Sequence, residues 1–190
     1  MKILRRLPQI LRYLPGKAQD LRAYFLTMQY WLGGSDDNVE QMIRFLVARY
    51  ADNAEWNRVE AKAPIAYPEV GLYHPDLPGH RITTDPADLP RPDAPVATVG
   101  LVMLRSYILA SDCAHYDAVI RGLEARGIAV LPAFAGGLDA RPAVERFFAG
   151  EGGASRIDAL ISLTGFSLVG GPAYNDSDAA VEMLKGLDVP

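Results

Sequence analysis

Apolar runs alternate with amphipathic segments along the second half of the chain. The apolar runs are expected to be strands, at residues 97–104, 128–134 and 157–163. The amphipathic segments predict helices from Asp112 to Arg126, from near Pro142, and from Asp176 to Leu187. Continuous apolar strands that alternate with helices are typical of a parallel sheet with helices on both faces. The pattern predicts an α/β fold containing a partial parallel sheet of three strands, joined by right-handed crossovers.

The first 50 residues show a helical period instead. One predicted helix has the apolar positions Ala18, Leu21, Phe25, Met28 and Leu32, and Gly33-Gly34 end it. Ser35 is expected to cap a second helix. The expected buried face of that helix comprises Val39, Met42, Ile43, Leu46, Val47 and Tyr50. Trp31 is expected to pack in the core of this helical segment.

The stretch between these two parts has no period. Eight prolines fall between Pro64 and Pro95, which is too many for a helix or a central strand. We therefore divide the chain into a helical unit at 1–50, a proline-rich connection at 51–95 and a partial α/β domain at 96–190. The predicted helix that ends at Gly127 is followed directly by a strand. The helix that ends at Leu187 is followed in the same way by Val189, so we expect another strand to begin there and the sequence to be cut before it.

Composition narrows the class of protein. A net charge of −4 argues against nucleic-acid binding, which needs a basic surface. The single cysteine, Cys113, excludes an internal disulfide and a cysteine-based zinc site. No apolar run is long enough for a transmembrane segment, and no signal peptide is recognisable. These features predict a cytoplasmic protein.

The common catalytic motifs do not occur. The chain contains no phosphate-binding loop of the G-x-x-x-x-G-K-[ST] type and no G-x-G-x-x-G after its first strand, so the Rossmann-like fold is expected to lack a dinucleotide site. The nucleophile elbow G-x-S-x-G and the zinc motif H-E-x-x-H are also absent. The three histidines, His74, His80 and His115, have no metal-ligand spacing, so no metal site is expected.

Candidate binding residues follow from the expected topology. Open parallel sheets bind ligands beyond the carboxyl ends of their strands. The candidates at those ends and in the first turn of the next helix are Arg105, Ser106, His115, Thr164, Gly170, Gly171 and Asn175. A guanidinium can bind a carboxylate with two hydrogen bonds, and glycines let a ligand approach the backbone closely. The alternatives are a salt bridge for Arg105, a structural histidine, and tight-turn geometry for the glycines.

Four long strings resemble one known family. They are QYWLGGSDDNV (29–39), VGLYHP (70–75), LRSYILASDCAHYDAVIRGLEARGIAVLPAFAGGLD (104–139) and SLTGFSLVGGPAYND (162–176). In order and spacing they are similar to the large subunits of magnesium chelatase, in the variant of bacteria that make bacteriochlorophyll. Members of that family are much longer, so the resemblance implies a fragment from the N-terminal half.

The resemblance also implies a function. The large subunit binds protoporphyrin IX and is where Mg²⁺ is inserted, while two partner subunits of the AAA+ type bind and hydrolyse ATP. The fragment is then expected to hold no cofactor of its own and to be inactive alone. Its candidate residues become candidates for porphyrin binding, since porphyrin propionates suit Arg105. Two alternatives stay open: the related large subunit of cobaltochelatase, which acts in cobalamin synthesis, and a non-catalytic scaffold or docking region of the chelatase complex.

Overall fold

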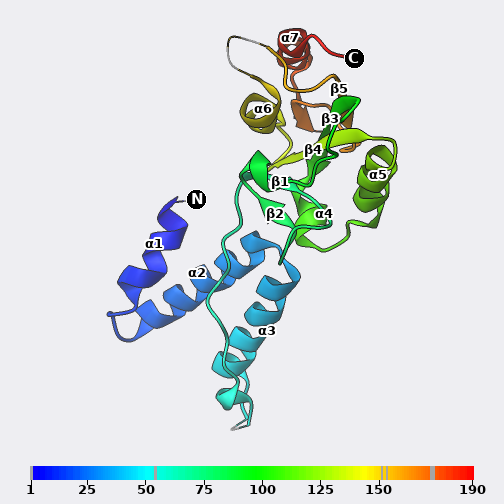
Figure 1. Cartoon of the computed structure of the whole chain (residues 1–190). Coiled ribbons are helices and arrows are strands. Elements are labelled where there is room, and N and C mark those ends of the chain that lie inside the picture. Colours follow the sequence, from blue (N-terminus) through cyan, green and yellow to red (C-terminus); the bar gives the residue numbers. More distant parts are fainter. Residues whose placement is uncertain (1, 54, 151, 153, 172–173) are drawn as a thin grey trace. The chain divides into compact units, whose positions relative to one another are not determined.

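The chain folds into two compact units, residues 1–67 and 68–190 (Figure 1). The computed structural model describes residues 2–53, 55–150, 152, 154–171 and 174–190. The first unit is helical, as expected, and the second is α/β. Each unit has its own internal packing and is described by itself.

The first unit contains three α-helices and one short 3₁₀ helix. Their bounds are α1 Lys2–Leu11, α2 Lys17–Gly33, α3 Asp36–Tyr50 and η1 Trp56–Arg58. Gly34 adopts a left-handed conformation with φ of 65° and its N–H donates to the Tyr30 carbonyl, which ends α2 as predicted. The buried Ser35 hydroxyl accepts the Asn38 N–H at 3.1 Å, so the predicted cap of α3 is confirmed.

An extended segment returns along α2 and α3 and is held by polar side chains. The Asn38 amide accepts the Ile65 N–H and donates to the Ile65 carbonyl, both at 2.9 Å. The Tyr30 hydroxyl donates to the Lys62 carbonyl at 2.5 Å, and Gln41 accepts the Lys62 N–H at 2.9 Å. These side chains satisfy backbone groups that would otherwise lack partners. The inner faces of α2 and α3 are therefore defined by hydrogen bonds to this segment.

The predicted buried face of α3 is wrong at half of its positions, because Val39, Ile43 and Tyr50 are exposed while Met42, Leu46 and Val47 are half-buried. Leu21 and Leu32 on α2 are 48% and 41% exposed, and Ile43 on α3 is 54% exposed. The expectation that Trp31 packs in the core of this unit is also wrong, because its side chain is 63% exposed. The periodicity identified an apolar stripe on each helix correctly, but the faces that pack within this unit are the ones that contact residues 62–65.

The second unit is built on a five-stranded sheet in the order β2-β1-β4-β3-β5. The strands are β1 Val70–Tyr73, β2 Ile82–Thr83, β3 Ala97–Leu104, β4 Ile128–Ala135 and β5 Ala159–Ser162. The predicted parallel sheet is confirmed: β3 pairs in parallel with β4 on one side and with β5 on the other. A two-stranded hairpin, β6 Gly170–Gly171 and β7 Tyr174–Asn175, lies after β5 in the chain.

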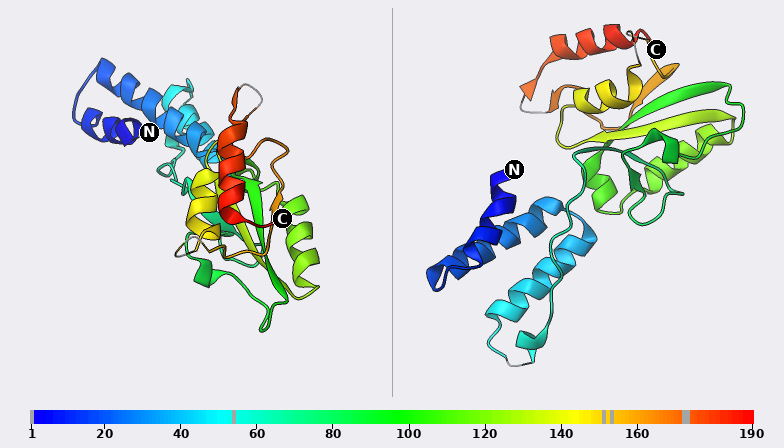
Figure 2. Two further views of the ribbon diagram at one scale, coloured as in Figure 1. Left: turned by 90° about the horizontal axis from the view of Figure 1, so that it is seen from above. Right: turned by 60° about the vertical axis from the view of Figure 1, so that its left-hand side comes forward.

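Helices cover both faces of this sheet (Figures 1 and 2). On one face α5 (Ala114–Glu124) packs its buried Tyr116 and Ile120 against β3 and β4, with the short α4 (Arg105–Leu109) beside it. On the other face lie α6 (Arg141–Ala143), the π-helical η3 (Val144–Phe148) and α7 (Ser177–Leu187). The two clusters on either side of the sheet form the core of the unit, as an α/β fold requires.

The proline-rich stretch is more ordered than its composition indicated. It contains β1, β2 and the 3₁₀ helix η2 (Pro86–Asp88), and β1 lies inside the sheet between β2 and β4. The expectation that no central strand forms there is wrong. The strand can form because its four residues contain no proline: Pro68 lies before β1 and Pro75 lies after it. The pairing of β1 with β4 ends at Leu72 opposite Ala133, one residue before Pro132.

The last residues of the chain lie beside β5. Asp188 takes a left-handed conformation that ends α7, and the Leu160 N–H in β5 donates to the Pro190 carbonyl at 2.8 Å. The expected further strand at Val189 stays a prediction, as do the domain boundaries at residues 50 and 95.

Gly100 in the middle of β3 allows us to test the packing of the sheet. A Cβ atom at Gly100 would lie 2.8 Å from Ile157 Cδ1 and 3.1 Å from the ring of Phe148, both buried. We predict that Gly100→Ala lowers the free energy of unfolding by about 1–3 kcal/mol, because the core is overpacked. The measurement is urea unfolding followed by circular dichroism.

Gly122 in α5 is the matched control, because a Cβ there meets only Arg126 Nη1, at 3.9 Å. Gly122→Ala should raise stability by about 0.5–1 kcal/mol through helix propensity. If Gly100→Ala unfolds at the same urea concentration as Gly122→Ala, the described packing around β3 is incorrect.

Candidate functional site

The carboxyl ends of β3, β4 and β5 meet at one edge of the sheet, because the three strands are parallel. The chain leaves β3 for β4 on one side, and β5 pairs on the other side of β3. This change of direction is the position at which open α/β sheets bind ligands. We therefore take this carboxyl edge as the candidate site and describe its hollows and its polar groups in turn.

A small cavity lies at the carboxyl edge. It is lined by the ends of β3 and β4 and by the loop after β5, with a volume of about 20 Å³. Thr164 is one of its lining residues, and its hydroxyl accepts the Phe166 N–H at 3.3 Å. A cavity of this size holds about one water molecule. It is too small for an organic ligand.

A larger, open hollow of about 690 Å³ shares Leu138 and Asp139 with the small cavity. Its other described lining residues are Arg141, Val169, Gly170, Gly171 and Tyr174. The surface is mostly apolar and carries one ion pair, in which Arg141 Nη2 lies 2.6 Å from Asp139 Oδ2. The hydrogen bonds from Arg141 lower the pKa of Asp139 below its usual range. The hollow therefore combines an apolar wall with a paired cation.

The two glycines of the hollow are explained by packing. Gly170 has φ of 102°, and a Cβ there would clash with the Tyr174 carbonyl oxygen across the hairpin. A Cβ on Gly171 would clash with the side chain of Leu138. Asn175, the partner of Gly170 in the hairpin, is exposed. Glycine is thus required at both positions by the protein's own contacts, with or without a ligand.

Arg105, Ser106 and His115 form a separate group, since none of them lines either hollow. Arg105 begins α4, is half-buried, and donates from Nε to the Pro68 carbonyl at 2.8 Å. Ser106 and His115 are exposed. The His115 ring lies 5.3 Å from that of Tyr107 and 3.9 Å from that of Tyr116. The predicted site residues therefore occupy two places, and their role in binding stays a prediction.

A polar network between the β1–β2 hairpin and α5 was not foreseen from the sequence. His74 is fully buried; its Nδ1 accepts the Asp76 N–H at 3.1 Å, so its Nε2 carries the proton and donates to Glu124 at 2.9 Å. Asp76 also receives two hydrogen bonds from Arg121. The only sequence signal was the turn YHPD. Spacing within the chain cannot show that residues 74 and 124 meet.

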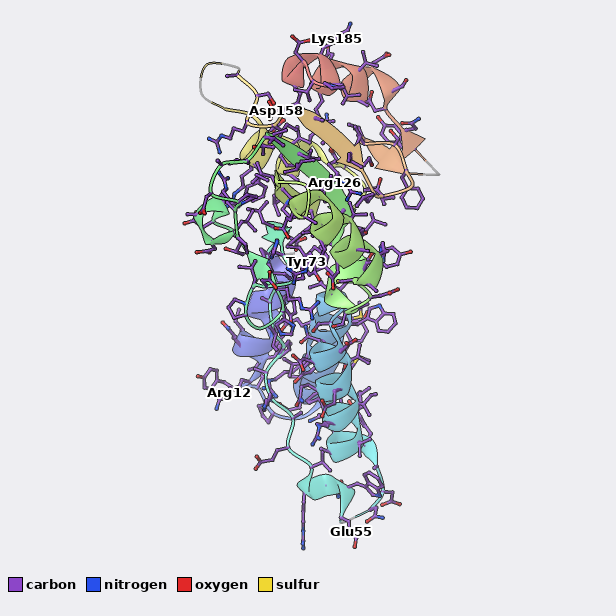
Figure 3. All side chains as sticks on the ribbon, turned by 45° about the vertical axis from the view of Figure 1, so that its right-hand side comes forward. Arg12, Glu55, Tyr73, Arg126, Asp158 and Lys185 are labelled. Carbon is purple, nitrogen blue, oxygen red and sulfur yellow. The ribbon has the colours of Figure 1, made fainter. Side chains whose placement is uncertain are left out.

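Tyr73, labelled in Figure 3, forms a second polar group between the β1–β2 hairpin and α5. Its hydroxyl donates to Asp117 at 2.6 Å and accepts from Arg81 at 3.2 Å, and Arg81 also pairs with Asp117 at 3.1 Å. Burial, and next the hydrogen bond to Asp117, raise the pKa of Tyr73 well above its usual range. Tyr73 therefore acts as a neutral donor. Every buried polar side-chain atom among the described residues is paired, which is the pattern of a structural anchor.

No metal centre is evident in the part of the chain that the structure describes. Within it, no group of three or more His, Cys, Asp or Glu side chains could hold a metal ion. The described helices also include none that is long and apolar enough to cross a membrane.

A family model described as CobN/Magnesium Chelatase matches residues 28–190. The chain belongs to this family. A second model, for a domain of unknown function, matches residues 1–25. The CobN/magnesium chelatase match covers the carboxyl edge, the hairpin β6–β7 and the polar network, so these features belong to a recognised domain.

Relatives within this family carry the name of one enzyme. The chain is 70% identical over 190 residues to the magnesium-chelatase H subunits of Rhodobacter capsulatus and Cereibacter sphaeroides. It is 40% identical over 205 residues to the chloroplastic magnesium-chelatase subunit ChlH of Oryza sativa subsp. indica. Each match covers 100% of this chain but only 15–16% of the relative. The chain thus spans about a sixth of their length.

A solved structure supports the fold. The catalytic subunit of cobaltochelatase from Mycobacterium tuberculosis superposes with a TM-score of 0.56 and 20% sequence identity, over 88% of this chain and 13% of that one. At this identity the likeness shows a shared fold only, and it does not distinguish a magnesium chelatase from a cobaltochelatase.

The Asp76–Arg121 pair yields a test of the network. Hydrogen bonds from Arg121 lower the pKa of Asp76 below its ordinary value of 3.8. We predict that Arg121→Gln raises the Asp76 pKa back toward that value in an NMR titration of the carboxyl carbon. Because the folded-state pKa is the depressed one, the pair contributes to stability above the ordinary Asp pKa, and this contribution is lost as the pH falls through the folded-state pKa.

Asp139 provides the control for this titration, because its pKa is lowered by a different arginine, Arg141. Arg121→Gln should leave Asp139 unchanged, and Arg141→Gln should raise only Asp139. An Asp76 pKa that does not respond to Arg121→Gln would show that the hairpin is not anchored to α5 in this way.

Proposed function

We propose that this chain is part of the large subunit of a magnesium chelatase, which inserts Mg²⁺ into protoporphyrin IX in (bacterio)chlorophyll biosynthesis. The observation that carries this is the 70% identity to two magnesium-chelatase H subunits along all 190 residues. Magnesium is favoured over the cobaltochelatase alternative because the relatives at 70% and 40% identity are named for magnesium.

Within that function, we assign the carboxyl edge to porphyrin handling. A porphyrin is a flat apolar macrocycle with two propionates, and the hollow beside β6–β7 has an apolar wall and a volume of about 690 Å³. Small-molecule sites usually measure about 300–1,000 Å³. Arg141 at its rim is a propionate partner of suitable geometry. Gly170 and Gly171 line this hollow, and Thr164 at the adjoining small cavity and Asn175 opposite Gly170 in the hairpin are further candidates in this proposal.

Arg105, Ser106 and His115 provide a second polar group at the start of α4 and α5. The exposed rings of His115 and Tyr107 offer a surface on which a macrocycle can stack. The Arg105 guanidinium carries five N–H donors in a planar fork, and Nε binds the Pro68 carbonyl. A propionate held there would be bound by a charge-assisted hydrogen bond.

The energy-coupling step belongs to other chains in this proposal. As the family resemblance implies, ATP is bound and hydrolysed in this proposal by two AAA+-type partner subunits, in the cytoplasm. Mg²⁺ is a substrate here, and it is slow to lose its tightly bound water. ATP hydrolysis can drive a conformational change around the metal and the porphyrin that overcomes this barrier. The 190 residues alone are then without chelatase and ATPase activity.

A scaffold role is the second candidate, and the structure offers a specific reason for it. The two arginines suited to propionates are already engaged, Arg105 with Pro68 and Arg141 with Asp139. In a scaffold these contacts are the whole role of the residues. In a porphyrin site the same contacts hold each guanidinium in the orientation in which it meets the ligand.

Substitution in the full-length subunit separates these two roles. We predict that Arg105→Ala weakens protoporphyrin IX binding by about 1.5–3 kcal/mol, roughly 10- to 150-fold in Kd, through loss of one charge-assisted contact. His115→Ala should weaken it by about 0.5–1.5 kcal/mol, through loss of a stacking surface. The measurement is a fluorescence titration with porphyrin on variants whose circular dichroism matches that of the unsubstituted subunit.

Arg126→Ala is the control, because this exposed arginine lies just after α5 and its side chain donates to the Gly122 carbonyl one helical turn earlier. Its porphyrin affinity should not change. Affinity and turnover that are unchanged in both His115→Ala and Arg105→Ala would assign these residues to the scaffold.

A further inference from the structure

The hollow beside the β6–β7 hairpin has one cation and one anion on its lining. Among its described lining residues only Asp139 and Arg141 are charged. Their side chains are 41% and 43% exposed, so solvent and ligands can reach both. The two charges cancel. A ligand in this hollow therefore meets an apolar wall beside a neutral ion pair, and not an isolated arginine.

Asp139 contacts one edge of the Arg141 guanidinium. Nε donates to Oδ1 and Oδ2 of Asp139 at 3.0 and 3.1 Å, and Nη2 donates to Oδ2 at 2.6 Å. Asp139 Oδ1 also accepts the backbone N–H of Arg141 at 3.0 Å. A guanidinium has five N–H donors in a planar fork, so the hydrogen bonds to Asp139 leave the Nη1 side for a second acceptor. A ligand carboxylate can share this guanidinium with Asp139.

The backbone on both sides of Asp139 is fixed. Two hydrogen bonds, of 2.8 and 2.9 Å, join residues 138–140 to residues 168–170, and Asp139 forms a β-bridge with Val169 between them. Because the backbone is held and Oδ1 binds the N–H of Arg141, Asp139 stays beside the guanidinium when a ligand arrives. Its negative charge then acts on the ligand as well as on Arg141.

We propose that Asp139 limits how tightly Arg141 holds a ligand carboxylate, so that the hollow binds a propionate-bearing porphyrin reversibly. This inference rests on the proposed function. A carboxylate at the Nη1 side lies about 4–6 Å from that of Asp139, and like charges at such a distance in an exposed site weaken binding by about three- to tenfold. Asp139 is thus a residue that sets affinity and ligand preference, and it acts through Arg141.

The reaction explains why a limited grip is useful. Insertion of Mg²⁺ replaces the pyrrole protons of the porphyrin and leaves its propionates unchanged. A propionate contact therefore stabilises substrate and product equally and does not speed the insertion step. A contact that is too strong only slows the release of the metallated porphyrin, and release limits the turnover of many enzymes.

Two further carboxylates act on Arg141 from outside this hollow. Hydrogen bonding to Asp139 is the main cause that raises the pKa of Arg141, and the charges of Asp176 and Glu145 add to it. Asp176 is needed as the cap of α7, because its Oδ1 accepts the Ala179 N–H. Glu145 is exposed and lines a different hollow, beside α7. Glu145 is therefore the matched control, since it contributes negative charge without lining the hollow of Arg141.

The test is a fluorescence titration of the full-length subunit with protoporphyrin IX and with its dimethyl ester, in the same mild detergent. The variants are Asp139→Asn, Arg141→Gln and the control Glu145→Gln, each with circular dichroism that matches the unsubstituted subunit. Asparagine keeps a side-chain oxygen for the N–H and Nε of Arg141, so it removes the charge and retains the cap. The ester has no ionised propionate, so it reports any change in the shape of the hollow.

We expect Asp139→Asn to bind protoporphyrin IX about three- to tenfold more tightly, through slower dissociation, and Arg141→Gln to bind it about tenfold more weakly. The Kd of the ester should change by less than about twofold in both variants, as should both Kd values in Glu145→Gln, where the exposed charge is screened. Unchanged or weaker binding of protoporphyrin IX by Asp139→Asn would overturn the proposal. An equal gain in affinity for the ester, or an equal gain in Glu145→Gln, would overturn it too.

Failure of this inference can be told apart from failure of the proposed function. If the unsubstituted subunit binds protoporphyrin IX and Arg141→Gln binds it equally well, the inference about Asp139 is overturned and the proposed function stands. An unsubstituted subunit that does not bind protoporphyrin IX would contradict the proposed function, and this inference with it.

Discussion

The parallel pairing of β3 with β4 on one side and β5 on the other is the constraint on which the second unit depends. Residues 99–103 of β3 are buried, and the side chains of neighbouring positions point into different clusters, Leu101 toward α5 and Val102 toward α6 and α7. Gly100 lets Phe148 and Ile157 close over the strand. Because both neighbours run parallel to β3, all three carboxyl ends lie at one edge, where the ends of β3 and β4 line the small cavity.

Parts of this fold could be predicted from the sequence because the signals are local. The apolar run 97–104 became β3 with the same bounds, and Ser35 caps α3 as its residue type indicated. The strand β1 was missed because four residues between prolines have too little pattern to count. They form a strand only because β4 and β2 supply hydrogen-bond partners on both sides.

The apolar stripes and the candidate site show the limit of sequence reasoning. The period of α2 and α3 identified their apolar faces, yet burial depends on what covers a face, and the inner sides of these helices are occupied by residues 62–65. For the site, the topology correctly directed attention to the strand ends. It could not show that Gly170 and Gly171 share a hollow with Arg141 while Arg105 and His115 lie elsewhere, because that depends on how loops fold back. The buried His74–Glu124 contact joins residues fifty positions apart, for which a single sequence contains no signal.

The central claim is that these residues are an interchangeable part of a magnesium chelatase large subunit. It is tested most directly by a chimera, in which this chain replaces the 190 aligned residues of the Rhodobacter capsulatus relative, with which it shares 70% identity. Mg²⁺ insertion into protoporphyrin IX is then measured with the partner subunits and ATP. The account predicts insertion at a rate comparable to that of the parent subunit. A chimera that is folded and stable but inserts no Mg²⁺ would contradict it.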